Sequence, residues 1–136
     1  MNVVKLISGL VVGSCVNMGI LMLSPHVIPP PEGVNVADVE SIKASIHLFK
    51  PIHFVFPFLA HALGTFFGAL LVSKLVPNKR FFYSMMIGIF FLLGGIANTY
   101  LIPHPRWFLY LDLIGAYLPM SLIASKILAP NKSKQN

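Results

Sequence analysis

Acidic residues, cysteine and charge in general are all scarce in this chain of 136 residues. Four residues are Asp or Glu, one is Cys, and only 10% are charged, whereas a soluble domain carries about 25% charged residues. So little charge argues against a soluble domain, and the single cysteine, Cys15, excludes an intrachain disulfide. Apolar residues are abundant instead, at 56% of the chain.

The apolar residues are gathered into four long runs, each about the length that crosses a ~30 Å hydrocarbon core as a helix. The sequence therefore predicts an all-α fold, a four-transmembrane-helix bundle forming a single membrane domain over residues 1–129. A rival reading of the first run is a lipoprotein leader cleaved before Cys15, but the run continues past this cysteine without becoming polar. The predicted spans cover about residues 3–23, 52–76, 81–102 and 107–128, with an outer loop at 24–51 and a disordered cytoplasmic tail at 130–136.

The charged residues divide between the two ends of these spans. Seven of the ten bases flank one set of ends, and all four acids fall in the opposite half. Because cytoplasmic loops are rich in Lys and Arg, we expect both termini in the cytoplasm of a multi-pass protein of the plasma membrane. The bases form no compact patch, so nucleic acid is not an expected partner. The seven inner bases are Lys5, Lys74, Lys79, Arg80, Lys126, Lys132 and Lys134.

Small residues recur at every fourth position of the first two spans. Residues at this spacing share one helix face, so each span carries a smooth stripe along which a neighbouring helix can approach closely. We expect the two stripes to meet, although glycine is also simply common in membrane helices. So small a bundle is further expected to form a homo-oligomer or to join a larger membrane complex, with the lipid bilayer around it. The stripes are Gly9, Gly13 and Asn17 in the first span and Ala60, Gly64 and Gly68 in the second.

The outer loop divides into a proline-rich part and an amphipathic part. Residues 25–33 contain four prolines, which predicts an extended, non-helical segment. Residues 39–49 follow a helical pattern with one apolar face, so a short extracytoplasmic helix should lie flat on the membrane or over the mouth of the bundle. The apolar face comprises Val39, Ile42, Ile46 and Phe49, and the polar face comprises Glu40, Lys43, His47 and Lys50.

Prolines also interrupt two spans. Pro57 should bend the second span near His53, and Pro119 should disturb the carbonyl of Gly115 in the fourth. A carbonyl freed in lipid needs a partner, so both bends should face protein.

Ionisable groups inside a membrane are expensive, and His61 and Asp112 are two such groups. The orientation places both in the outer half of the bundle, at a depth that Asn17 and Asn98 also reach. We therefore predict a polar pocket that opens to the outer face beneath the loop helix. Its predicted lining residues are Asn17, Glu40, His47, His53, His61, Asn98 and Asp112.

Simpler roles remain open for each of these polar groups. The two asparagines could hydrogen-bond a neighbouring helix, Asp112 could pair with Arg106, and His61 could donate to a carbonyl freed by Pro57.

Three functions follow from the predicted pocket. The preferred one is a non-enzymatic protein that binds a small or lipidic ligand, or an accessory subunit. A second is a membrane enzyme or a zinc- or copper-type metal site built from His53, His61 and Asp112, with Glu40 as a further candidate ligand. A third is a proton-coupled transporter working as an oligomer. The chain has no His-Glu-x-x-His motif, phosphate loop or cysteine cluster, so no cofactor can be named.

Four short motifs are spread along nearly the whole chain. They are Pro-Glu-Gly at 31–33, Asp-x-Glu-Ser at 38–41, Leu-Ala-His-x-Leu-Gly-Thr at 59–65 and Pro-His-Pro-x-Trp-Phe at 103–108. In these the chain resembles a group of small uncharacterised bacterial four-helix integral membrane proteins. The resemblance implies four spans and a bacterial inner membrane, and it implies no activity and no functional residue.

Overall fold

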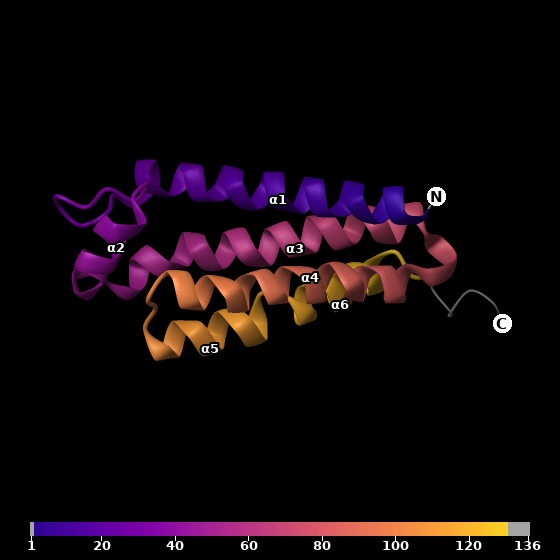
Figure 1. Cartoon of the computed structure of the whole chain (residues 1–136). Helices are drawn as coiled ribbons and strands as arrows, with labels where there is room; N and C mark the ends of the chain where they lie inside the picture. Colours follow the sequence, from indigo (N-terminus) through magenta and orange to yellow (C-terminus); the bar gives the residue numbers. More distant parts are fainter. Residues whose placement is uncertain (1, 131–136) are drawn as a thin grey trace.

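Four helical units run side by side along one direction (Figure 1). The computed structural model describes residues 2–130, and within this range the chain is all-helical, with no strand. Each unit is long and apolar enough to cross a membrane. The four-helix architecture is thus confirmed, while the predicted tail falls almost wholly outside the described range. The units are α1 (Asn2–Val27), α3 (Val55–Leu75) with a preceding 3-10 turn (Pro51–Phe54), α4 (Arg80–Leu101), and α5 (Arg106–Gly115) followed by α6 (Leu118–Ile127).

The predicted contact between the glycine stripes is confirmed as the packing of α1 against α3. A Cβ atom on Gly13 would lie 2.7 Å from the carbonyl oxygen of Gly64, and one on Gly68 would lie 2.6 Å from that of Gly9. Real Cβ atoms essentially never come so close to another heavy atom. The two backbones therefore approach to a distance that only glycine permits, which is how helices associate where lipid gives no hydrophobic drive.

The end of α1 differs from the prediction. The helix passes through Pro25 and ends at Val27, so the non-helical part of the loop begins only at Ile28. Proline removes one backbone donor but leaves the rest of the final turn intact, and the amide of Ile28 still donates to the carbonyl of Ser24 at 2.9 Å. The prediction of a non-helical segment from Pro25 onwards was therefore wrong for its first three residues.

The amphipathic loop helix is confirmed, although it is shorter than predicted. It forms α2 (Val39–Ser45) and a 3-10 turn (Ile46–Leu48). Asp38 caps α2 by accepting a hydrogen bond from the amide of Glu40 at 3.1 Å. The segment lies over one end of the bundle (Figure 1).

The disturbance predicted at Pro119 occurs as a break in the helix, whereas Pro57 coincides only with a change of helix type in an unbroken span. The fourth span is broken: α5 ends at Gly115, and α6 begins at Leu118, just before Pro119. In the second span the helix changes from 3-10 to α at Val55, and Pro57 occupies the first turn of α3, where amide donors have no partner within the helix. The break in the fourth span is the feature that shapes the functional site.

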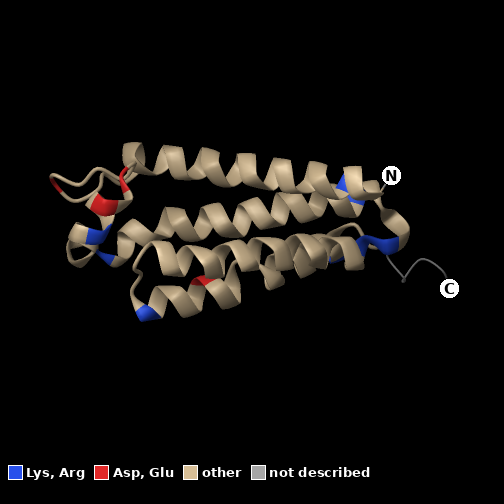
Figure 2. Ribbon diagram, in the orientation of Figure 1, with Lys and Arg blue, Asp and Glu red and all other residues tan. Residues whose placement is uncertain are grey.

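The two ends of the bundle differ in their charged residues (Figure 2). Lysine and arginine mark the end where α1 begins and α3 ends, while the loop between α1 and α3 carries acids and bases at the opposite end. At the first end, the ammonium group of Lys5 donates to the carbonyl of Leu75 at 3.1 Å and joins α1 to α3.

Candidate functional site

His61 and Asp112 form a direct pair in the interior of the bundle. The Nδ1 atom of His61, on α3, lies 2.8 Å and 2.9 Å from the two carboxylate oxygens of Asp112, on α5. The two side chains are only 14% and 8% exposed. The hydroxyl of Tyr117 donates to the same carboxylate at 3.1 Å, and its ring stacks on that of His61 with centroids 5.7 Å apart. One carboxylate thus fixes both an imidazole and a phenol.

The break in the fourth span explains how Tyr117 reaches Asp112. The two residues are five positions apart, which in a continuous helix points their side chains about 140° away from each other. Between α5 and α6 the backbone leaves the helical path, with φ −112° and ψ −77° at Tyr117. Gly95 on α4 makes room for the phenol ring, because a Cβ atom there would lie 2.7 Å from Cζ of Tyr117. Pro119 and Gly95 together therefore place the phenol beside the carboxylate.

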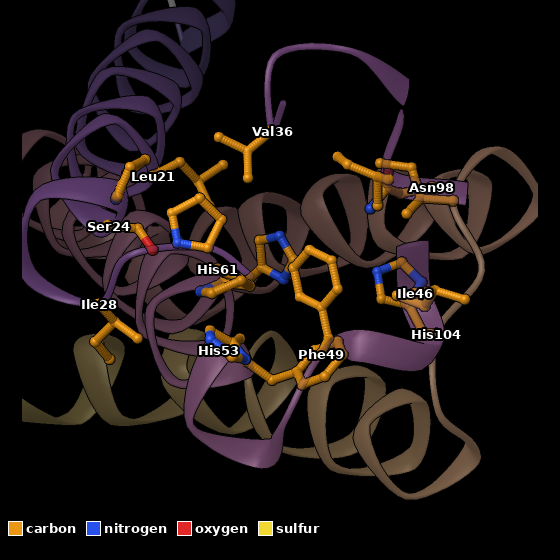
Figure 3. Close-up of a pocket in the computed structure, with 16 residues that line it drawn as sticks. Leu21, Ser24, Ile28, Val36, Ile46, Phe49, His53, His61, Asn98 and His104 are labelled. Carbon is orange, nitrogen blue, oxygen red and sulfur yellow. The ribbon is translucent and has the colours of Figure 1, made fainter. Parts of the chain in front are cut away.

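An upper cavity of about 310 Å³ lies between these groups and the loop helix (Figure 3). Its wall is mostly aliphatic and aromatic, with three histidines, a serine and an asparagine among the lining side chains. Ile42, Ile46 and Phe49 supply the roof, so the apolar face predicted for the loop helix covers the end of the bundle. The lining residues are Leu21, Ser24, Pro25, Ile28, Pro30, Val36, Ile42, Ile46, Phe49, His53, Phe54, Pro57, His61, Asn98, Ile102 and His104.

A lower cavity, also of about 310 Å³, adjoins the first, and the two share Leu21, His61 and Asn98. It lies between α1, α3, α4 and the break in the fourth span. Two of the residues that line it carry a buried polar atom without a hydrogen-bond partner, Oδ1 of Asn17 and Oγ1 of Thr65. Unmet hydrogen-bonding capacity therefore lies in the wall of this cavity. Its lining residues are Asn17, Leu21, His61, Gly64, Thr65, Phe91, Gly94, Gly95, Asn98 and Tyr117.

The structure gathers most of the predicted pocket residues and leaves out two. Four of them line one or both cavities. Asp112 lines neither cavity but is hydrogen-bonded to Nδ1 of His61. Glu40 and His47 are exposed and line neither cavity, and Glu40 forms an ion pair with Lys43 at 2.9 Å. The residues that do line a cavity are Asn17, His53, His61 and Asn98.

Two simpler roles are also excluded. The carboxylate of Asp112 bonds His61 and Tyr117, and no ion pair between it and Arg106 forms among the described residues. Nδ1 of His61 accordingly serves the carboxylate and not a carbonyl freed by Pro57.

Three residues of the site are not predicted by the sequence pattern: Thr65, His104 and Tyr117. Thr65 stands one helical turn after His61, a spacing that could have indicated a shared face. Tyr117 depends on the geometry of the break, which no spacing rule supplies.

His104, in the turn between α4 and α5, lines the upper cavity and stacks on Phe108 with ring centroids 5.5 Å apart. Its Nδ1 atom is buried without a partner. Burial lowers the pKa of His104 below its ordinary value of 6.5 and outweighs the smaller, opposing effect of the nearby backbone of Ile102.

The metal site considered from the sequence is not assembled. Within residues 2–130, no three His, Cys, Asp or Glu side chains are grouped closely enough to hold a metal ion. Nδ1 of His53 instead accepts a hydrogen bond from the amide of Lys50 at 2.8 Å, at the start of the 3-10 turn. His53 is thus occupied locally, and its role in the upper cavity is limited to Nε2 and the ring face.

No protein-family model, curated protein or solved structure matches this chain. The resemblance to small bacterial four-helix membrane proteins therefore stays a prediction. The function has to be argued from the two cavities and the groups that line them.

Proposed function

We propose that this is an integral membrane protein that binds a small amphipathic ligand in the two adjoining cavities. The observation that carries the proposal is their contrast in lining across a shared boundary at His61. Eleven of the 16 residues that line the upper cavity are aliphatic, proline or phenylalanine, whereas five of the 10 that line the lower cavity are polar. The polar groups of the lower cavity are an imidazole, a phenol, a threonine and two asparagines, of which the imidazole and one asparagine are shared with the upper cavity. A ligand with an apolar part and a polar group matches this division.

Selectivity would come from the polar cavity. A bilayer is about as apolar as the upper cavity, so moving an alkyl chain between them changes the free energy little. A hydrogen bond formed in a low-dielectric interior is stronger than one formed in water. The fixed orientation of His61, held by Asp112, is the kind of preorganisation that limits the entropy lost on binding.

The charge distribution supports an orientation with both termini in the cytoplasm and the loop helix outside. In that orientation the upper cavity opens toward the outer face of a bacterial inner membrane. Helix α1 packs mainly on α3 and leaves most of its surface exposed. Lipid, a second copy of the chain or another membrane subunit would cover that surface.

The binding test uses matched alkyl probes on the protein in zwitterionic nanodiscs. Octylamine, octanol and octanoate are titrated against loaded and empty discs, and bound probe is counted by native mass spectrometry. At least one probe should bind saturably to loaded discs. Failure of all three would overturn the ligand-binding function and favour an accessory subunit.

Two glycine variants show whether binding occurs in the cavity. Gly94 lines the lower cavity, and a Cβ atom there would meet nothing within 4 Å, so Gly94→Phe should fill space at low structural cost. Gly19 on α1 has equally open surroundings and lines neither cavity, so Gly19→Phe is the matched control. Binding should fall in the first variant alone, and an equal fall in both would contradict a cavity site.

A proton-coupled transporter is the second candidate, and the broken fourth span favours it. Transporters often place their substrate sites at discontinuous helices near the middle of the membrane. Here the break lies directly beside the His61–Asp112 pair. Uptake of labelled octyltrimethylammonium, whose fixed charge slows passive diffusion, is measured under a pH gradient in proteoliposomes and in protein-free liposomes. Gradient-driven uptake in the proteoliposomes alone would distinguish transport from binding.

A further inference from the structure

We propose that the polar group of the ligand is a primary ammonium, bound in the lower cavity beside His61. This inference rests on the proposed ligand-binding function and names the chemical class of the ligand. It follows from the sign of the buried charge and from the kind of hydrogen-bonding atoms left without partners.

The buried charge is negative. Among the described residues, Asp112 is the only buried Asp, Glu, Lys or Arg. Its carboxylate accepts hydrogen bonds from His61 and Tyr117, which are neutral donors unless the imidazole takes up a proton. A carboxylate without a cation is costly inside a membrane, so a cationic group next to His61 would be stabilised.

The imidazole of His61 can link the carboxylate of Asp112 to a cationic ligand through hydrogen bonds. When Nδ1 of His61 donates its hydrogen to Asp112, the other ring nitrogen of the neutral ring, Nε2, is an acceptor. No hydrogen bond within residues 2–130 uses Nε2, and the His61 side chain lines both cavities. An N–H of a ligand cation would complete a chain from ammonium to imidazole to carboxylate.

The unmet acceptors have the matching chemistry. Oγ1 of Thr65 lies on a residue with 0% exposure, and Oδ1 of Asn17 is buried; both atoms lack a partner and both residues line the lower cavity. With Nε2 of His61 they can supply three acceptors, although the hydroxyl of Thr65 can also donate. A primary ammonium carries three N–H donors and no acceptor, whereas a carboxylate offers no donor to any of them.

The remaining walls suit a cation with an apolar tail. Phe91 and Tyr117 present aromatic rings to the lower cavity, and ring faces attract cations. Leu21 and Asn98 line both cavities, so an alkyl chain leaving the ammonium can continue past them into the upper cavity beneath Phe49. The ligand class is therefore an amphiphilic primary amine.

The head-group series tests this class on the wild-type protein. Octylamine should bind about tenfold more tightly than octanol, because charge-assisted hydrogen bonds are stronger than neutral ones. Octanoate should bind most weakly, and octyltrimethylammonium should bind less tightly than octylamine because it has no N–H. If octanol or octanoate binds as tightly as octylamine, the amine class is overturned while ligand binding itself stands.

Substitutions at buried hydroxyls test whether octylamine binds beside Thr65. Thr65→Val keeps the shape of the side chain but removes the acceptor, and it should weaken octylamine binding several-fold. Ser73→Ala is its control, because Ser73 on the same helix also carries a buried hydroxyl without a partner yet lines neither cavity. An equal effect of the two variants, or no effect of either, would contradict the role of Thr65.

Asp112→Asn removes the charge and should bring the affinity ratio of octylamine to octanol close to unity. A ratio that stays near its wild-type value would overturn the electrostatic argument. Thr65→Val and the wild-type series keep the proposal falsifiable if Asp112→Asn does not fold.

Discussion

The two halves of the bundle differ in how their buried polar atoms are hydrogen-bonded. In the half near the termini, hydroxyls bond backbone carbonyls: Ser84 donates to the carbonyl of Ser121 at 2.7 Å, and Ser125 donates to that of Leu122 at 2.7 Å. Among the described residues of this half, Ser73 is the exception, because its buried hydroxyl has no partner. In the half beneath the loop helix, Asn17, Thr65 and His104 keep unmet polar atoms beside open cavities. The first half is organised for packing, and the second keeps hydrogen-bonding capacity for something else.

The largest expected effect is on the packed half. Gly13→Leu would drive a side chain into the backbone of α3, because even a Cβ atom there would lie 2.7 Å from the carbonyl oxygen of Gly64. We expect a loss of about 3 kcal/mol or more, measured as thermal unfolding in detergent. Gly19→Leu, at a glycine with nothing within 4 Å, should leave the unfolding temperature nearly unchanged. Similar losses in both variants would mean that the α1–α3 contact does not limit stability.

A smaller loss is expected from the cavity half. Asp112→Ala leaves His61 and Tyr117 without their shared partner, which should destabilise the protein by about 2 kcal/mol. The control is Glu40→Ala, which removes the exposed ion pair with Lys43 and should change stability by less than about 0.5 kcal/mol. Chemical or thermal unfolding of both variants in one detergent gives the comparison. A neutral Asp112→Ala would show that the pair contributes nothing to folding.

Tyr117→Phe separates the hydrogen bond from the stacked ring. The variant keeps the aromatic contact with His61 and loses only the hydroxyl that donates to Asp112. The expected loss is about 1 kcal/mol, read from the same unfolding curves. A loss as large as that of Asp112→Ala would indicate that the phenol, rather than the imidazole, is the main partner of the carboxylate.

The smallest expected effect is the loss of stability on acidification. The folded protein lowers the pKa of His104 by burial, so the unfolded chain binds its proton more readily. The stabilising contribution is complete above the ordinary value of 6.5 and is lost as the pH falls toward the depressed pKa. Melting temperatures measured across this window should fall on acidification, and the fall should be smaller in His104→Leu. An equal acid response in the variant would assign the sensitivity to other groups.

The sequence predicted the packed half more completely than the cavity half. The α1–α3 contact follows from the spacing of Gly9, Gly13, Gly64 and Gly68, because helical periodicity alone puts them on facing stripes. The cost of placing His61 and Asp112 in a membrane predicted that they matter, and their depth predicted that they could meet.

Other features depended on three-dimensional detail. Tyr117 reaches Asp112 only through the irregular backbone between α5 and α6, and no periodicity describes an irregular turn. Glu40 and His47 share the loop helix that covers the pocket, but the apolar face of that helix forms the roof, so neither polar side chain lines a cavity. The run of prolines from Pro25 predicts a non-helical segment, although a helix tolerates the loss of one hydrogen bond in its final turn.

The single tryptophan of the chain, Trp107, gives the protein its own optical signal. The indole packs edge-on against Phe54, with ring centroids 5.6 Å apart, and Phe54 is part of the wall of the upper cavity. All tryptophan emission therefore originates one side chain away from the space where an alkyl tail would lie. A probe carrying a quencher on that tail would report its arrival by a drop in fluorescence, without any label on the protein.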